Sequence, residues 1–383
     1  MKKLLYVLSA GVLLAGCSDE SPTNINPEAP RQNVQYWGSD ADSDGIDDGT
    51  EWDLANRFAP VLSMPNLIER SSSTPGDWAW PATMDYYLPR VRMRMHHDNC
   101  PDHTVLNTGY VSSYSITRQS HQRAASYLGC THSGATYYSN RDWAAENHFF
   151  LQPTDDGVHQ GVRSPDQWKV YFHAYKNNIG GINIQYWFFY AYNDFAGGFN
   201  HEADWEHINV KLRSDYTPEG VYFSAHHDVA WHPWYNVTRL DETHPRVWVA
   251  DGSHASYNSF YNCNTTYVYG WPESCWDLDT QRWYTWSGGR GYNIGYQGAG
   301  LVNIGEKATP MSGQEWIQYS GRWGELGSGL TFGGTDGPRG PAYQGNWTRD
   351  AYVAPSGGGG YTNECTEEGG QTTSRELMPS CPL

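Results

Sequence analysis

Residues 200–210 constrain the fold more than any other part of the chain, because they place two carboxylates at the start of a half-buried β-strand. Strand side chains alternate between faces, so Asp204 and Glu206 share a face with Ile208 and should point toward a core. Two carboxylates on an apolar face repel each other and carry a large desolvation cost. A divalent metal bound with His201 from the preceding loop would neutralise both. The alternative is an exposed strand end that accepts backbone hydrogen bonds.

The rest of the chain reads as a series of strands, which predicts an all-β fold. Its 383 residues include 18 Trp, 28 Tyr and 41 Gly, a composition that favours strands and turns. Most aromatic side chains are expected to fill the core. The best strand candidates are residues 169–174, 182–192, 205–212, 220–226 and 246–250. Residues 184–190 are apolar nearly throughout and should form a central strand. We expect a β-sandwich with long loops over residues 59–350.

An acidic segment before this region matches the calcium-loop pattern D-x-D-x-D-G-x5-E in full. Six acidic residues this close together would repel one another without a cation, although a solvated acidic linker is the alternative. The candidate ligands are Asp40, Asp42, Asp44, Asp48 and Glu51, with Gly45 at the sharp turn. The loop resembles the structural calcium repeats of thrombospondin type 3 or dockerin. A short helix over 51–58, ending before Pro60, completes a calcium-loop segment spanning 37–58.

The first residues resemble a bacterial lipoprotein signal. A basic start and an apolar run lead to Leu14-Ala15-Gly16-Cys17, which is similar to a lipobox. The apolar run is too short to span a bilayer permanently, so residues 1–17 are predicted to direct export and Cys17 to carry the lipid anchor. Ser18 after the cysteine favours delivery to the bacterial outer membrane, facing either side. Residues 18–36 are expected to form a flexible tether.

Six further cysteines predict a disulfide framework in an exported protein. Fifteen pairings are formally possible, and short loops favour Cys100 with Cys130, Cys263 with Cys275, and Cys365 with Cys381. The last pair would close a glycine-rich tail over residues 351–383. A zinc site is the competing interpretation, but the chain contains no C-x-x-C spacing.

The charge of the chain excludes one class of partner. Its formal net charge is -17, and no Lys/Arg cluster occurs beyond the signal. Nucleic acid is therefore not an expected partner, and simple electrostatic adhesion to anionic lipid is not expected either.

Several motifs in one order resemble the vacuolar protein sorting-associated protein 62-like family, over roughly residues 54–350. They are Arg57-Phe58-Ala59-Pro60-Val61-Leu62, Trp80-Pro81, Met84-Asp85-Tyr86-Tyr87-Leu88, Val170-Tyr171-Phe172-His173, Asp204-Trp205-Glu206-His207, Val249-Ala250-Asp251-Gly252-Ser253-His254, Gly321-Arg322-Trp323-Gly324 and Gly337-Pro338-Arg339-Gly340-Pro341.

The central block is also similar to the G-H-R-H-D-W-E signature of necrosis- and ethylene-inducing peptide-like proteins. Those are secreted β-sandwich cytolysins that hold a divalent cation at one pole and recognise sphingolipid head groups. The resemblance implies a metal site of Asp194, His201, Asp204 and Glu206. Ala203 stands where that signature has its second histidine.

Two histidines at strand ends are candidate catalytic residues. His226 and His254 could each be a metal ligand, a general base or a hydrogen-bonded structural histidine. The chain contains no G-x-S-x-G, no H-E-x-x-H and no phosphate loop.

These patterns lead to one function and two alternatives. We expect a lipid-anchored protein that recognises a membrane lipid or glycan head group in a cation-dependent way, with cytolysin-like membrane damage as a variant. Calcium is the expected ion, and magnesium or another divalent cation is the alternative at the second site. A metal-dependent hydrolase and a non-catalytic surface scaffold are the other hypotheses, so the sequence leaves enzyme activity open.

Overall fold

The computed structural model describes residues 39–97, 100–122, 126–127, 130–131, 136–141, 148–195, 200–225, 230–268, 270–286, 294–326, 336–344 and 347–348. All of them belong to one unit of the chain, which begins at Gln35. Cys17 with its signal, the tether, His226 and the tail with Cys365 and Cys381 lie outside the described residues. Those assignments stay predictions.

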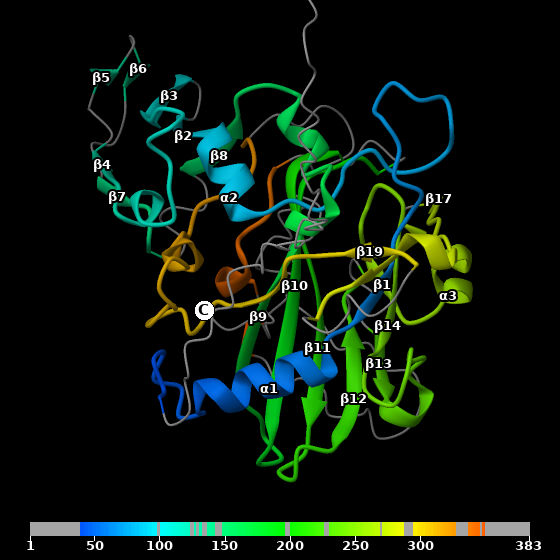
Figure 1. The fold of residues 1–383 in the computed structure, drawn as a ribbon. Helices are drawn as coiled ribbons and strands as arrows, with labels where there is room; N and C mark the ends of the chain where they lie inside the picture. The colour runs from blue at the N-terminus through cyan, green and yellow to red at the C-terminus, as the bar shows by residue number, and fades with distance from the viewer. Residues whose placement is uncertain are drawn as a thin grey trace, which may run out of the picture. The chain divides into compact units, whose positions relative to one another are not determined.

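A six-stranded sheet forms the centre of this unit (Figure 1). Its order is β13 (Ala230–Pro233), β12 (Pro218–Phe223), β11 (His201–Leu212), β10 (Ile182–Asn193), β9 (Lys169–Lys176) and β20 (Gly300–Asn303). Neighbouring strands are antiparallel except for β20, which runs parallel to β9. Nearly every residue of β10 is buried, because both its faces are covered. The prediction that residues 184–190 form a central strand is confirmed.

A five-stranded sheet packs against one face of the six-stranded sheet. Its order is β15 (Ser256–Tyr257), β14 (Arg246–Val249), β1 (Val61–Ser63), β18 (Arg282–Tyr284) and β19 (Tyr296–Gln297). One hydrophobic cluster joins the two sheets, with Val61 and Val247 on one side and Ile184, Ile208 and Val210 on the other. The predicted all-β fold is confirmed.

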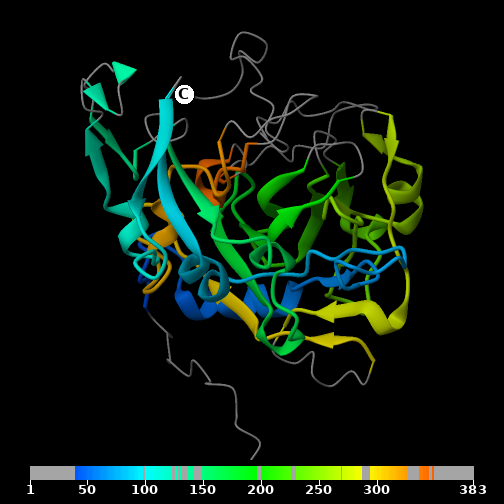
Figure 2. The ribbon, with the colours of Figure 1, turned by 90° about the horizontal axis from the view of Figure 1, so that it is seen from above.

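The helix α1 (Asp48–Phe58) shares the same core, since Leu54, Ala55 and Phe58 are part of that cluster. Figures 1 and 2 show α1 on the side of the six-stranded sheet that also carries β18 and β19. The helix begins earlier than predicted because Asp47 caps it, its carboxylate accepting the Thr50 N–H at 3.0 Å. It ends before Pro60, as expected.

Smaller elements surround these layers. The other helices are α2 (Met84–Tyr87) and α3 (Phe260–Thr265), and the 3-10 turns are η1 (Leu88–Arg90), η2 (Ser115–Thr117), η3 (Val158–Gln160), η4 (Pro165–Gln167), η5 (Trp234–Asn236), η6 (Asp279–Gln281), η8 (Glu315–Gln318) and η9 (Pro341–Tyr343). A three-stranded sheet contains β3 (Cys100–Leu106), β2 (Val91–His97) and β8 (Phe149–Pro153). The strand pairs are β4 (Ser120–Gln122) with β7 (Thr136–Tyr138), β5 (Ser126–Tyr127) with β6 (Cys130–Thr131), and β16 (Tyr267–Val268) with β17 (Trp271–Pro272).

A second core, rich in aromatic side chains, covers the other face of the six-stranded sheet. Trp205 lies 4.6 Å from Phe189 and 5.3 Å from Trp316, measured between ring centroids. Trp323 packs edge-on against Trp205 and Trp316. The expectation that most aromatic residues fill the core therefore holds for these side chains. Within the described residues, no helix has the length and apolar character needed to span a membrane.

Strand β11 begins earlier than the sequence suggested. His201 was expected in a loop, but it pairs with Asn193 at the first position of β11, and Glu202 pairs with Tyr192. The reason is that β10 continues to Asn193 and supplies partners for the added residues. The prediction that Asp204 and Glu206 share the face of Ile208 is confirmed by this register.

The disulfide between Cys263 and Cys275 is present, with a Cα–Cα distance of 5.9 Å. Cys263 lies in α3 and Cys275 pairs with Ala250 in an isolated bridge, so the disulfide connects α3 to the end of β14. Cys100 and Cys130 lie in strands whose side chains at these positions are not described, so their pairing stays a prediction.

Replacing both Cys263 and Cys275 by serine should lower the free energy of unfolding by about 2–4 kcal/mol, because the unfolded chain gains freedom. Urea denaturation of oxidised wild type and the double variant measures this difference. Mass spectrometry of unreduced peptides also tests the Cys100–Cys130 and Cys365–Cys381 pairs. Free thiols at Cys263 and Cys275 in protein from an oxidising compartment would contradict the assignment.

Candidate functional site

Two of the predicted calcium ligands shape the acidic loop, which we define as residues 39–51. The carboxylate of Asp40 accepts the backbone N–H groups of Asp44 and Gly45, both at 3.1 Å. The carboxylate of Asp48 accepts the N–H of Ala41 at 3.0 Å. Gly45 has a φ of +82°, which glycine adopts without strain. These bonds close the loop into a turn in front of α1.

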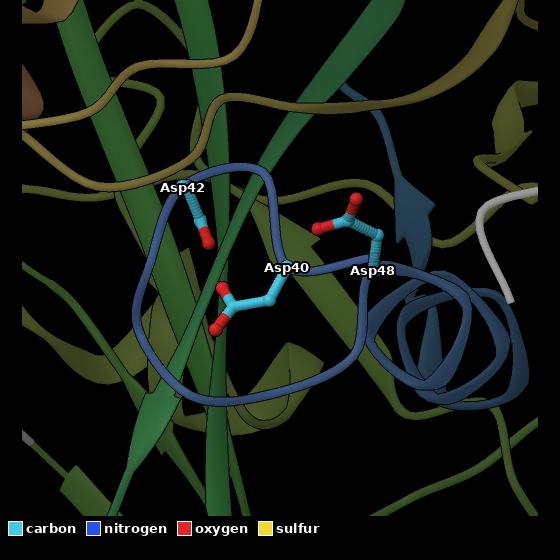
Figure 3. Close-up of side chains that lie close together, drawn as sticks. All are labelled: Asp40, Asp42 and Asp48. Carbon is cyan, nitrogen blue, oxygen red and sulfur yellow. The ribbon is translucent and has the colours of Figure 1, made fainter. Parts of the chain in front are cut away.

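The other carboxylates of the loop are buried and converge. Asp42 is 1 % exposed and Glu51 is fully buried. Both carboxylate oxygens of Asp42, and one each of Asp44 and Glu51, have no hydrogen-bond partner among the described residues. Ligand atoms of these three residues lie within 4.8 Å of one another, as do those of Asp40, Asp42 and Asp48. Figure 3 shows Asp40 and Asp42 pointing into the loop and Asp48 where α1 begins.

The electrostatics of the loop favour binding of a cation. Burial raises the pKa of Asp42 to about 7, and the charge of Asp44 adds to the effect. Burial raises the pKa of Glu51 to about 9, with the charge of Asp42 as the next cause. Buried carboxylates that lack both partners and positive charge are costly. Clustered carboxylate oxygens are what Ca²⁺ prefers, so the residues fit the predicted ion, whose identity stays a prediction.

A buried charged triad lies at the end of the six-stranded sheet where β11 begins. His254 places its Nδ1 2.7 Å from a carboxylate oxygen of Asp204 and its Nε2 3.1 Å from one of Asp77. The side chains of His254 and Asp77 are at most 1 % exposed, and that of Asp204 is 6 % exposed. The ring of Tyr190 stacks on the imidazole at 3.7 Å.

The triad keeps His254 protonated. Burial acts to lower the pKa of His254, but the charge of Asp77 and the hydrogen bond to Asp204 outweigh it and raise the pKa to about 10. Between two carboxylates, His254 has the position of a hydrogen-bonded structural histidine. Its candidate roles as general base or metal ligand stay predictions.

Asp77 is a site residue that the sequence patterns did not predict. It lies in Asp77-Trp78-Ala79-Trp80-Pro81, where an acidic residue stands inside an aromatic segment. Its carboxylate also accepts the N–H groups of Ala79 at 2.8 Å and Gly252 at 3.0 Å. A lone acid flanked by tryptophan is the signal that could have marked this position, because such an acid is expected to be buried and paired.

The remaining predicted ligands are distributed around this triad. His201 is buried, and burial lowers its pKa, so it is neutral; its ring lies 2.7 Å from the carbonyl oxygen of Ala203. Glu206 is 2 % exposed. Within the described ranges, ligand groups of three or more converge only in the acidic loop. Asp194, His201, Asp204 and Glu206 do not form such a group here, and their metal site stays a prediction.

Asp194 differs from Asp204 because it is half-buried and borders an aromatic pair. Its carboxylate accepts the side-chain amide of Asn200 at 2.7 Å and the indole N–H of Trp78. The rings of Trp78 and Tyr192 lie 5.3 Å apart, and Trp78, Tyr192 and Asp194 are all partly exposed. We call Trp78, Tyr192, Asp194 and Asn200 the polar end. It places a carboxylate beside two partly exposed aromatic side chains, whose rings also pack against His159 and Arg70.

Comparisons with known proteins give a limited result. No protein-family model and no curated protein matches the chain, so the resemblance to the vacuolar protein sorting-associated protein 62-like family gains no support. Similar solved structures are necrosis- and ethylene-inducing proteins and their relatives. Necrosis and ethylene inducing protein 2, from the causal agent of cocoa's witches' broom disease, is 16% identical over 51% of this chain and 60% of its own, with a TM-score of 0.25.

Two further structures are similar at the same level. NLPPya in complex with glucosamine is 12% identical over 68% of this chain and 75% of its own, with a TM-score of 0.28. The non-toxic HaNLP3 protein is 13% identical over 52% of this chain and 71% of its own, with a TM-score of 0.25. This chain thus spans about 60% of the length of the cocoa pathogen protein. At these TM-scores the alignments establish no shared activity, and function is argued from the site.

Calcium should raise the Tm of the wild type, because an ion that binds only the folded state stabilises it by about 2.7 kcal/mol at 100 times its Kd. Asp42→Asn should abolish this dependence, since it removes a buried carboxylate from both converging groups. Asp53→Asn, an exposed acid on α1, is the matched control and should behave like the wild type. Identical melting curves for calcium-loaded and chelated wild type would show that the loop is only an acidic turn.

The stability of the protein should fall as pH rises, because of His254. Its folded pKa of about 10 exceeds the ordinary 6.5, so its contribution is complete below pH 6.5 and is lost as pH rises toward 10. His254→Gln should cost about 3–5 kcal/mol at pH 6 and remove this alkaline decline. Urea denaturation at several pH values with chelator present measures both effects. His244→Gln is the control, since burial lowers the pKa of His244; parallel pH curves for wild type and His254→Gln would refute the charged triad.

Proposed function

We propose that the protein is a binding protein that recognises a hydroxylated head group, of a membrane lipid or a glycan, at the polar end. The observation that carries the proposal is the position of Asp194. Its carboxylate is oriented by Trp78 and Asn200 and is only half-buried, beside the ring of Tyr192. Carboxylate oxygens accept hydrogen bonds from hydroxyl groups, and the exposed parts of the Trp78 and Tyr192 side chains can contact the apolar surface of a sugar or a lipid.

Asp204 and Asp194 have different partners, and this difference supports Asp194 as the carboxylate that binds the ligand. Asp204 is already paired with His254, so it contributes to the rigidity of the polar end and has less capacity left for a direct contact with a ligand. Asp194 has no such counter-charge among the partners described for it, which are an amide and an indole. A carboxylate held by neutral donors keeps acceptor capacity for a ligand. The polar end is therefore a preformed acceptor on a rigid support.

Cation dependence belongs to the proposal as an expectation from the sequence. Asp194 with His201, Asp204 and Glu206 would hold the ion, and the acidic loop would hold a separate, structural one. A neutral His201 is compatible with metal binding, whereas the pairing of Asp204 with His254 competes with it. Comparing calcium, magnesium and chelator in binding assays of wild type and of Asp42→Asn, which lacks the loop site, separates the two contributions.

The experiment is a binding titration of the purified protein against immobilised lipid head groups and glycans. Glucosamine and mannosamine are included as probes because NLPPya is solved in complex with each. Asp194→Asn should weaken binding by at least about tenfold, since it removes the charge while keeping the shape (a factor of ten is about 1.4 kcal/mol). Asp53→Asn, an exposed acid on α1, should leave binding unchanged.

Three outcomes distinguish the function classes. Saturable association with an unchanged ligand supports the binding protein, and dye release from vesicles adds the cytolysin-like variant. Product release from the ligand would replace it with the hydrolase. Equal affinity of Asp194→Asn and wild type would remove the polar end as the binding site.

A further inference from the structure

A cavity on another part of the molecule is lined by polar and aromatic side chains together. Its volume is about 420 Å³, within the range of roughly 300–1,000 Å³ of small-molecule sites. Glu306, Lys307, Gln318, Tyr343 and Trp347 are among its lining residues. Glu306 and Lys307 follow the edge strand β20 in the chain, and the proposed function does not use the cavity.

The back of the cavity is rigid. Trp347 stacks on His173 with their ring centroids 3.7 Å apart and their planes at 2°. His173 is fully buried and places its Nε2 2.9 Å from a carboxylate oxygen of Glu306, while its Nδ1 lies 3.3 Å from Gln185. Gln185 on β10 and Asp194, the first residue after that strand, are nine positions apart, or about 30 Å at 3.3 Å per residue. The cavity and the polar end are thus separate places.

The acidic loop holds the wall of this cavity. Asn303, at the end of β20, donates its side-chain amide to Glu51 at 2.9 Å. Thr309 donates its hydroxyl to the backbone carbonyl of Asp42. Glu306 and Lys307 lie between the two residues that make these hydrogen bonds. We call residues 303–309 the wall segment; the acidic loop is hydrogen-bonded to it on both sides of the residues that line the cavity.

The charges around the cavity indicate what it can hold. The Lys307 ammonium lies 3.7 Å from the centre of the Tyr343 ring, so it would repel a cationic ligand from that aromatic face. Glu306 would repel an anionic ligand, and its charge also acts on Asp42 and Asp44. A neutral ligand with many hydroxyl groups is repelled by neither Lys307 nor Glu306. Amide, carboxylate and ammonium groups beside aromatic rings supply both donors and acceptors for it.

We propose that this cavity binds a neutral saccharide of one or two sugar units, and that a cation in the acidic loop holds the wall segment 303–309 in the binding position. Three oxygens that converge in the loop come from Asp42, Asp44 and Glu51. The cation neutralises these carboxylates and so stabilises the two bonds, through Glu51 and Asp42, that position the wall. Saccharide and cation then bind with positive coupling, each strengthening the other.

The test is a calorimetric titration of the full-length protein with maltose, cellobiose and methyl glucoside, each with calcium or with chelator. At least one saccharide should bind with calcium and should bind about tenfold more weakly with chelator. Lys307→Ala and Gln318→Ala, at partly exposed lining positions, should weaken binding at least tenfold. Lys169→Ala, a lysine of β9 paired with Asp85, is the matched control and should bind like the wild type.

Two variants test the coupling between calcium and saccharide binding. Glu51→Gln should bind saccharide as weakly with calcium as wild type does with chelator, while Asp53→Asn should behave as wild type. Choline and inorganic phosphate serve as charged probes, and binding of either one in place of the saccharides overturns the proposal. Failure of all three saccharides overturns it as well, and equal affinity with calcium and chelator overturns the coupling.

Comparing Asp194→Asn with Lys307→Ala decides whether the saccharide binds at the polar end or in the cavity. If Asp194→Asn abolishes saccharide binding and Lys307→Ala does not, binding belongs to the polar end and the cavity proposal fails. If Lys307→Ala abolishes it and Asp194→Asn does not, the cavity proposal stands independently of the proposed function.

Discussion

The charge on the buried His254 imidazolium is the interaction on which the polar end depends. It compensates Asp77 and Asp204, which would otherwise be two uncompensated carboxylates in the core. Through Asp77 it also fixes the turn at Gly252, whose carbonyl oxygen accepts the N–H of Asp194 at 2.9 Å. One charge therefore connects three parts of the chain that are distant in sequence. Asp194, the proposed ligand-binding carboxylate, takes its position from that connection.

The acidic loop presents the opposite solution to the same electrostatic problem. There the converging carboxylates of Asp42, Asp44 and Glu51 include no histidine, lysine or arginine, and several of their oxygens have no partner among the described residues. Positive charge approaches the loop from outside this group, since the Lys176 ammonium lies beside Gly45 and the charge of His173 acts on Asp44. The triad is thus complete within the protein, whereas a cation bound by the loop stays a prediction. Because of this difference, we expect removal of the cation to change the structure of the loop, and of the wall segment hydrogen-bonded to it, more than that of the triad.

The layered architecture gives these sites separate supports. The polar end continues the β10–β11 pair, which is held between two cores, while the cavity is lined by residues that follow β20 and by Trp347, which stacks on His173 of β9. The long central strand β10 separates the two places by most of its length. Binding at each can therefore be altered independently, because the residues involved share no direct contact described here.

The sequence by itself determined the local features: the central strand, the faces of Asp204 and Glu206, the end of α1 before Pro60 and the clustering of acids in the loop. These follow from side-chain alternation, from the geometry of proline and from short spacing, which neighbouring residues impose on one another. It also predicted that Asp204 either meets a positive charge or lies at an exposed strand end. Only the tertiary structure decided that His254 can supply this charge, that Asp77 shares it, and that Asn303 and Thr309 meet the acidic loop. Those partners lie far apart in the chain, and the packing of the layers alone brings them within hydrogen-bonding distance.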